Sequence, residues 1–212
     1  MPVYMKFILF ALLGFGLGGI LFSYHLPKLF KGIDICEVSE DHNPGTYNAI
    51  HYAGVPVGIL CLLCDLMKGF LPVFFAMRML DYRMLPFALV LAAPVLGHAC
   101  APLYRKKGGK AVAVTFGALL GLLPESMAVF LLAALYLFFS VAIVINPHEK
   151  RTVVVFFLFT ALAAVGAAFT GRWSIALGCA AISCIVMLKN RAGIPEQKGE
   201  PAKEEPRPAH VP

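Results

Sequence analysis

Apolar stretches alternate with short polar stretches over most of this chain. The apolar stretches cover residues 3–30, 55–79, 84–104, 111–123, 126–145, 152–170 and 173–188. A helix needs about 20 apolar residues to cross a hydrocarbon core of about 30 Å, and the stretch at 111–123 is short by that rule. The pattern predicts an all-α polytopic membrane protein with about seven transmembrane helices.

Helix-breaking residues mark several borders between these stretches. Pro124 follows the fourth stretch, Asn146-Pro147 follows the fifth and Gly171 follows the sixth, and proline and glycine commonly end helices at such positions. Beyond residue 191 the chain is rich in Pro, Glu and Lys, a composition typical of disorder. We expect a single transmembrane domain over residues 1–191 and a disordered cytoplasmic tail over 192–212.

Composition and charge agree with a membrane protein. Hydrophobic residues make up 59% of the chain and charged residues 14%, which is too apolar for a soluble domain of this length. The 18 Lys and Arg residues are spread along the chain rather than gathered in one block or stripe, so they indicate membrane topology and no nucleic-acid partner. With the N-terminus outside, ten of them fall in inner loops and four on the outer side. The positive-inside rule therefore predicts an outside N-terminus and a cytoplasmic C-terminus.

The six cysteines point to no disulfide framework. Cys61 and Cys64 form a C-x-x-C pair inside an apolar stretch, but no second ligand pair accompanies them. A thiol in that setting behaves as a small hydrophobic group, so packing is favoured over redox or metal chemistry. We expect no metal site and no cofactor.

Three polar segments interrupt the apolar pattern, and the predicted topology places all three near the cytoplasmic face. The first covers residues 40–51, which are dense in short hydrogen-bonding side chains and include Asp41, Asn43, Gly45, Asn48 and His51. A glycine in such a loop lets the backbone approach a ligand closely. The alternative is a turn-rich connector that binds nothing.

The second polar segment lies inside the stretch at 55–79. Asp65 and Lys68 are three residues apart there, so they share one face of a helix. Charges at membrane depth are costly unless they are paired or face water, which favours a pair that lines a cavity. The alternative is a structural ion pair that joins two helices.

The third polar segment begins at Gly97-His98 and continues into a cationic run before the stretch at 111–123. Two glycines between two lysines at a helix start offer free backbone N–H groups and positive charge, which suit a phosphate. The residues in question are Lys107, Gly108, Gly109 and Lys110. Their spacing is not that of a Walker A loop. The alternative is a positive-inside anchor.

These three segments resemble motifs of the bacterial acyl-phosphate-dependent glycerol-3-phosphate acyltransferases of the PlsY type. Residues 29–38 resemble the family's LFKGIDIREV, and Asn43, Gly45 and Asn48 match its GSGNxGATNxxR at the same spacing. Residues 65–69 resemble DxxKG, and residues 97–113 resemble GHxFPxFxxFKGGKGVAT without a gap. The resemblance implies seven spans, an outside N-terminus and a cytoplasmic active site, in agreement with the topology predicted from charge.

The chain also departs from these motifs. Asp41 stands where the first motif has Ser, and His51 stands where it has Arg. Ala111 replaces the Gly that follows the last Lys of the third motif. Near the C-terminus the family's HRxNI is reduced to residues 190–194, with Asn190 in the place of the His.

The resemblance implies transfer of a fatty acyl group from acyl phosphate to the 1-hydroxyl of glycerol 3-phosphate, giving lysophosphatidate and phosphate for phospholipid biosynthesis. The partners would be these two substrates and the lipid bilayer, and the location would be the bacterial inner membrane, which the chain crosses several times. Binding both phosphates close together and neutralising their charge would supply much of the rate.

The resemblance also suggests roles for individual residues. The segment from Lys107 to Lys110 would bind the anion, and Asn43, Gly45 and Asn48 would form the opposite wall. Asp65 and Lys68 would orient that wall from the membrane side. His98 and Asp41 are candidates to orient or deprotonate the attacking hydroxyl, and His51 would donate to a phosphate when protonated.

Two other functions stay open on the sequence. A catalytically weakened relative would bind lipid or solute phosphates, and the altered C-terminal motif favours it. A transporter for a phosphate-bearing solute would be expected to carry internal repeats and broken helices at the midplane. His148, in a short loop, is interpreted as an ordinary loop residue.

Overall fold

The computed structural model describes residues 2–104 and 108–191, and every regular element among them is helical. The helices are α1 (Val3–Gly18), α2 (Phe22–Lys31), α3 (Ile35–Val38), α4 (Thr46–Ala53), α5 (Val55–Met79), α6 (Phe87–Cys100), α7 (Val112–Leu120), α8 (Ala128–Val141), α9 (His148–Thr170) and α10 (Trp173–Arg191). The predicted all-α class is therefore confirmed. The tail at 192–212 lies outside the described residues.

Each predicted apolar stretch contains a helix, but several helices are shorter than the stretch. Four helical segments are long and apolar enough to cross a membrane: Val3–Lys31, Val55–Met79, His148–Thr170 and Trp173–Arg191. The helices α6 and α8 are apolar but shorter, and α7 has 9 residues. The chain is thus an all-α integral membrane protein, and the number of spans stays a prediction.

The first apolar stretch is interrupted where α1 gives way to α2. Gly19 ends α1 and Leu21 precedes α2, so the apolar stretch at 3–30 forms two helices rather than one. The interruption leaves the carbonyl oxygen of Ile20 available, and Lys68 of α5 donates to it at 2.6 Å. The break therefore brings α5 and the N-terminal helices together through a buried polar contact.

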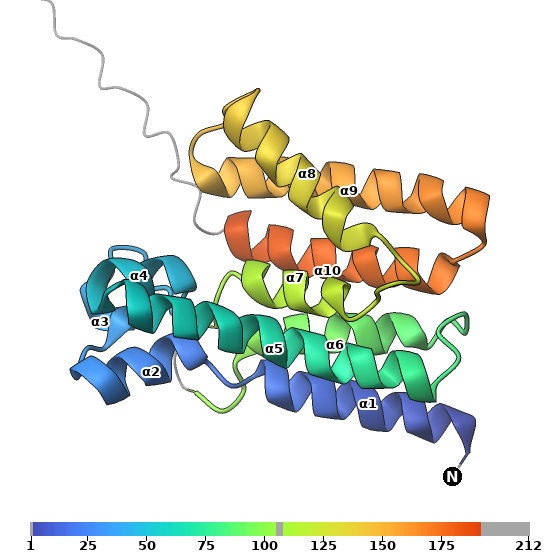
Figure 1. The fold of residues 1–212 in the computed structure, drawn as a ribbon, viewed down its shortest axis with the longest axis horizontal. Coiled ribbons are helices and arrows are strands. Elements are labelled where there is room, and N and C mark those ends of the chain that lie inside the picture. Colours follow the sequence, from blue (N-terminus) through green and yellow to red (C-terminus); the bar gives the residue numbers. More distant parts are fainter. Residues whose placement is uncertain (1, 105–107, 192–212) are drawn as a thin grey trace, which may run out of the picture.

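The helices α1, α5, α6 and α7 approach one another closely through glycines. A Cβ atom at Gly97 would overlap the carbonyl oxygen of Phe15 in α1, and one at Gly117 would overlap that of Leu66 in α5. Small residues allow such close packing between membrane helices. Figure 1 shows α8 and α9 as a further layer. This layer lies on the side of α7 and α10 that faces away from α1.

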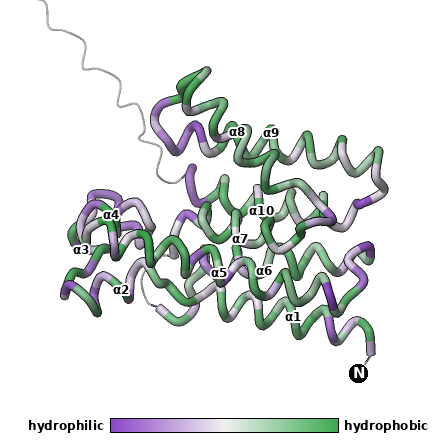
Figure 2. The backbone as a smooth tube through the Cα atoms, in the orientation of Figure 1, coloured by the Kyte–Doolittle hydropathy of each residue, from purple (hydrophilic) through white to green (hydrophobic). Residues whose placement is uncertain are grey.

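The largest group of hydrophilic segments lies at one end of the helix bundle. Figure 2 shows them around α3 and α4, at the start of α9 and at the end of α10. The helices between the two ends of the bundle are largely hydrophobic. This end of the molecule is where the polar segments of the sequence meet.

A polar cavity as the candidate functional site

A cavity of about 920 Å³ opens among these polar segments. Eight of the predicted site residues line it: Asp41, Asn43, Gly45, Asn48, His51, Asp65, His98 and Lys110. Its wall also includes residues that the sequence analysis did not select, namely Glu40, His148, Glu149, Arg151, Thr152 and Asn190. All three predicted segments thus contribute to one cavity, although they are far apart in the sequence.

The loop before α4 is shaped by its own side chains. The Nδ2 of Asn48 donates to Asp41 Oδ1 at 2.8 Å and to the carbonyl oxygen of Asn43 at 2.8 Å. The backbone N–H of Asn43 also donates to Asp41 Oδ1, at 3.3 Å. Both hydrogens of the Asn48 amide are therefore used inside the loop. Asn48 fixes the shape of the wall, and it keeps only its carbonyl oxygen for a ligand.

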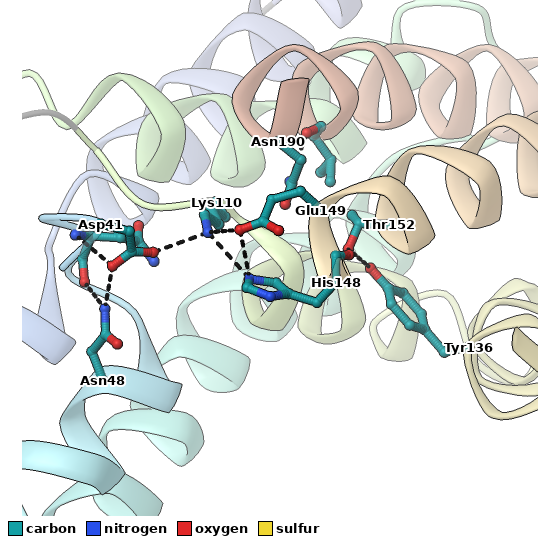
Figure 3. A network of polar contacts seen from close by, with 10 residues as sticks. Asp41, Asn48, Lys110, Tyr136, His148, Glu149, Thr152 and Asn190 are labelled. Atoms are coloured by element: carbon teal, nitrogen blue, oxygen red, sulfur yellow. Dashed lines mark hydrogen bonds and ion pairs between the residues drawn. The ribbon is translucent and has the colours of Figure 1, made fainter. Parts of the chain in front are cut away.

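Lys110 is the centre of the polar contacts in this cavity (Figure 3). Its Nζ lies 3.0 Å from Asp41 Oδ2 and 3.0 Å from Glu149 Oε1. It also lies 3.3 Å from His148 Nε2. We call Asp41, Lys110, His148 and Glu149 the Lys110 cluster. The cluster joins the loop before α4, the segment that leads into α7 and the first turn of α9.

The charges of this cluster stabilise one another. Burial favours the neutral form of Asp41, but the hydrogen bonds from Lys110 and Asn48 outweigh it and hold the pKa of Asp41 below its ordinary value. Burial likewise disfavours the charged form of Lys110, but its hydrogen bonds to Glu149 and Asp41 raise its pKa above the ordinary value. Both groups are consequently ionised at neutral pH.

The first turn of α9 was missed as part of the site. His148 is the first residue of α9 rather than a loop residue, and Glu149 follows it. Thr152 Oγ1 donates to the carbonyl oxygen of His148 at 2.9 Å, and the hydroxyl of Tyr136 donates to Thr152 Oγ1 at 3.3 Å. The signal was available, because the predicted topology placed this loop on the same side as the three polar segments.

Asp65, Lys68 and His98 form a second, buried cluster, which we call the Lys68 cluster. Lys68 Nζ lies 2.8 Å from Asp65 Oδ1, and both side chains are 2% exposed. Lys68 also contacts His98 Nδ1 at 2.7 Å. The hydroxyl of Ser23 donates to Asp65 Oδ2 at 3.0 Å. Asp65 and His98 reach the cavity wall, whereas Lys68 does not line it.

The glycines of the third segment pack against the end of α6. A Cβ atom at Gly108 would overlap the carbonyl oxygens of His98 and Ala99, and one at Gly109 would overlap His98 Nε2. Neither glycine is among the residues that line the cavity. Of the predicted anion cradle, Lys110 lines the cavity, and Lys107 lies outside the described residues. Whether Gly108 and Gly109 bind an anion stays a prediction.

His51 lies on α4 and lines the cavity. The ring of His51 stacks on that of Tyr47, with centroids 6.3 Å apart.

In the part of the chain that the structure describes, no group of three or more His, Cys, Asp or Glu residues is placed to hold a metal. Cys61 is buried and donates to the carbonyl oxygen of Phe22 at 3.7 Å, so it packs between α5 and α2.

Comparison with known proteins identifies similar chains. A family model described as glycerol-3-phosphate acyltransferase matches residues 8–197. A glycerol-3-phosphate acyltransferase of Thermotoga petrophila is 45% identical over 113 residues, which cover 53% of this chain and 57% of that protein. One of Pseudothermotoga lettingae is 35% identical over 159 residues, which cover 72% of this chain and 78% of that protein.

Solved structures of similar fold are also known. A crystal structure of PlsY (YgiH), described as an integral membrane glycerol 3-phosphate acyltransferase in its glycerol 3-phosphate form, superposes with a TM-score of 0.74 at 21% identity. The superposition covers 89% of this chain and 90% of that chain. The lysophosphatidic acid form gives a TM-score of 0.72. The arrangement of helices is therefore shared over most of both chains.

Proposed function

The chain belongs to the glycerol-3-phosphate acyltransferase family, and from that premise we propose that it transfers a fatty acyl group from acyl phosphate to the 1-hydroxyl of glycerol 3-phosphate. The products would be lysophosphatidate and inorganic phosphate, as a step of phospholipid biosynthesis. Two observations support the substrates: the family match over residues 8–197, and the glycerol 3-phosphate and lysophosphatidic acid forms of a protein with the same fold.

The observation that carries the proposal is the composition of the cavity wall. Lys110 and Arg151 supply positive charge for phosphate groups, while Leu62, Val112 and Phe116 provide an apolar side. An acyl phosphate combines a phosphate head with a hydrocarbon tail. A cavity with both kinds of wall at the polar end of a membrane protein suits such a molecule and a small phosphorylated acceptor together.

Acyl phosphate is a mixed anhydride and is already activated, so transfer needs no covalent enzyme intermediate. The protein would hold the acceptor hydroxyl close to the acyl carbon and neutralise the two phosphates. We assign phosphate binding to Lys110 and the opposite wall to Asn43, Gly45 and Asn48. Asp41 and Glu149 would hold the Lys110 side chain in place until an anion engages it.

The Lys68 cluster would support this site from the membrane side. It ties the interruption between α1 and α2 to α5 and to the end of α6. The end of α6 in turn contacts Gly108 and Gly109, directly before Lys110. Asp65 and Lys68 would therefore act by keeping the wall in position, and His51 would add a phosphate contact from the cavity wall.

The placement in the membrane is part of the proposal. The distribution of Lys and Arg supports an outside N-terminus and a cytoplasmic C-terminus. The cavity would then open to the cytoplasm, where glycerol 3-phosphate is available. The location would be the bacterial inner membrane, crossed several times by the chain.

The test is phosphate release by the purified protein in lipid nanodiscs. We expect release from acyl phosphate that requires glycerol 3-phosphate and yields lysophosphatidate. Lys110→Ala should reduce kcat/KM for glycerol 3-phosphate by about 10- to 100-fold, because a charge-assisted phosphate contact contributes about 1.5–3 kcal/mol. The matched control is Lys150→Ala, since Lys150 is exposed and does not line the cavity. Folded wild-type protein without acceptor-dependent release would contradict the proposed activity.

A further inference from the structure

Arg151 is a cavity residue whose guanidinium has no partner in the described part of the protein. It is the fourth residue of α9 and lines the cavity. Its Nε is buried, and within the described ranges 2–104 and 108–191 the Arg151 side chain forms no hydrogen bond and no ion pair. A buried donor without an acceptor costs free energy, so its presence in a folded protein calls for an explanation.

A structural role does not account for this charge. An arginine that stabilises a fold donates to carbonyl oxygens or pairs with a carboxylate, as Arg172 does with Glu125. Arg151 has neither kind of partner among the described residues. A guanidinium keeps its charge at neutral pH and presents a planar fork of N–H donors. The ligand that suits such a group is an anion with several oxygens, such as a phosphate.

The Lys110 cluster needs a further cation to hold a phosphate. The ammonium group of Lys110 lies 3.0 Å from a carboxylate oxygen of Asp41 and 3.0 Å from one of Glu149. One cation between two carboxylates leaves an excess of negative charge when His148 is neutral, so the cluster by itself does not attract an anion. Arg151 is the other permanent cation among the described residues that line the cavity, and it offsets this excess.

Arg151 and Lys110 belong to different parts of the cavity wall. Lys110 contacts Asp41, in the loop before α4. The charge of Arg151 acts on the hydroxyl of Tyr136 in α8. The ring centroids of Tyr136 and Phe116 are 5.9 Å apart, and Phe116 belongs to the apolar side of the cavity. Two cations placed in this way can hold the phosphates of a donor and an acceptor, or one phosphate from two sides.

We propose that Arg151 binds a substrate phosphate, as a second anion-binding group beside Lys110. This inference rests on the proposed acyltransferase function. The phosphate belongs to acyl phosphate or to glycerol 3-phosphate, which present the same kind of oxygens. Because no partner among the described residues fixes the guanidinium, the side chain can turn to donate two parallel N–H···O bonds to a phosphate. Such a contact chiefly lowers the KM of the substrate concerned.

The first test is the binding of inorganic phosphate to the purified protein in lipid nanodiscs, measured by isothermal titration calorimetry. Arg151→Gln should raise the Kd for phosphate by about tenfold or more, because a charge-assisted contact is lost. Arg151→Lys keeps the charge but not the planar fork, so its Kd should lie between those of the wild type and Arg151→Gln. Lys150→Gln is the matched control, since Lys150 is the neighbouring cation, is exposed and does not line the cavity.

Steady-state kinetics identify which phosphate Arg151 binds. If Arg151→Gln raises the KM for acyl phosphate by about tenfold or more and leaves that for glycerol 3-phosphate within about twofold, the donor is the ligand. The reverse result assigns the contact to the acceptor. A rise in both KM values places the guanidinium between the two phosphates. Each of these three results supports the inference.

Thermal unfolding separates this role from a structural one. Removing an arginine that holds the fold together lowers Tm, whereas removing a buried cation without a partner does not. In phosphate-free buffer we therefore expect the Tm of Arg151→Gln to equal or exceed that of the wild type. Added phosphate should raise the Tm of the wild type and of Lys150→Gln, and it should raise that of Arg151→Gln much less.

The outcomes separate this inference from the proposed function. If Arg151→Gln keeps the Kd for phosphate and both KM values within about twofold of the wild type, Arg151 binds no substrate phosphate and the inference is overturned. If the folded wild type binds phosphate through Arg151 but shows no acceptor-dependent transfer, the failure lies in the proposed function. Should Arg151→Gln fail to fold, Arg151→Lys decides, and a Kd and KM values equal to those of the wild type would overturn the inference.

Discussion

The two lysine clusters have similar chemistry but different surroundings. Lys68 contacts Asp65, His98 and the Ile20 carbonyl, and its side chain is 2% exposed. Lys110 contacts Asp41, Glu149 and His148, and its side chain is 18% exposed at a cavity. A buried pair among packed helices has fixed partners, whereas a pair at a cavity can exchange a carboxylate for an incoming anion. Burial, rather than residue type, separates the lysine to which we assign a structural role from the one that we assign to phosphate binding.

The largest expected effect comes from breaking the Lys68 cluster. Lys68→Met leaves the Asp65 carboxylate buried without its cation, which costs about 3–5 kcal/mol of folding free energy. Thermal unfolding in detergent or nanodiscs would measure the loss. The double variant Asp65→Asn, Lys68→Met should recover much of it, because no unpaired charge remains. A single variant as stable as the wild type would show that the cluster has no structural role.

The matching change in the Lys110 cluster should affect stability much less. Lys110→Met is expected to lower the free energy of unfolding by about 1 kcal/mol or less, because partly exposed ion pairs contribute little. By contrast, the same variant should strongly reduce the turnover of glycerol 3-phosphate. Unfolding and turnover measured on the same preparation would test this reversal. A Lys110→Met protein that is as destabilised as Lys68→Met would remove the distinction between the clusters.

The pH dependence of the free energy of unfolding should show how the charges of the Lys110 cluster contribute to stability. The lowered pKa of Asp41 means that its contribution is complete above its ordinary value of 3.8 and is lost as the pH falls through a lower value. The raised pKa of Lys110 means that its contribution is complete below 10.5 and is lost as the pH rises through a higher value. Asp41→Asn should therefore shift Tm equally at about pH 6 and 8, with a smaller shift below about pH 4. A shift that differs between the two neutral conditions would contradict these directions.

The smallest expected effect concerns the residue next to Lys110. Ala111 precedes α7 with a φ of 64°, in the left-handed region that favours glycine. Ala111→Gly should raise the free energy of unfolding by about 0.5 kcal/mol, because relief of backbone strain slightly exceeds the entropy that glycine adds to the unfolded chain. Thermal unfolding would detect the change. A clear loss of stability would show that the buried Ala111 methyl group matters more than the strain.

Much of the fold could be predicted, because helix formation in a membrane depends on local composition. Every apolar stretch contains a helix, and the borders at Pro124, Asn146-Pro147 and Gly171 lie between helices. The interruption between α1 and α2 was missed, because the stretch at 3–30 is apolar throughout that region. At the interruption the carbonyl oxygen of Ile20 accepts a hydrogen bond from Lys68, which lies 48 positions away along the chain.

The candidate site was predicted in part. The three motifs identified Asp41, Asn43, Asn48 and Lys110, because their residue types and spacing are local properties of the chain. The same reasoning assigned both glycines before Lys110 to the anion, which stays a prediction, but it did not show that they pack against the end of α6. Their packing depends on a neighbouring helix, which spacing along the chain does not describe.

The sequence by itself determined the helical class, the polar segments and the family, since each depends on residues that are near one another in the chain. Only the tertiary structure decided which groups share the cavity. Glu149 lies 39 positions from Lys110 along the chain, yet it is within 3.0 Å of its ammonium group. The physical reason is that helix faces are matched by close packing, as at Gly97 and Gly117. Such packing depends on the shapes of two surfaces together, and neither segment carries that information alone.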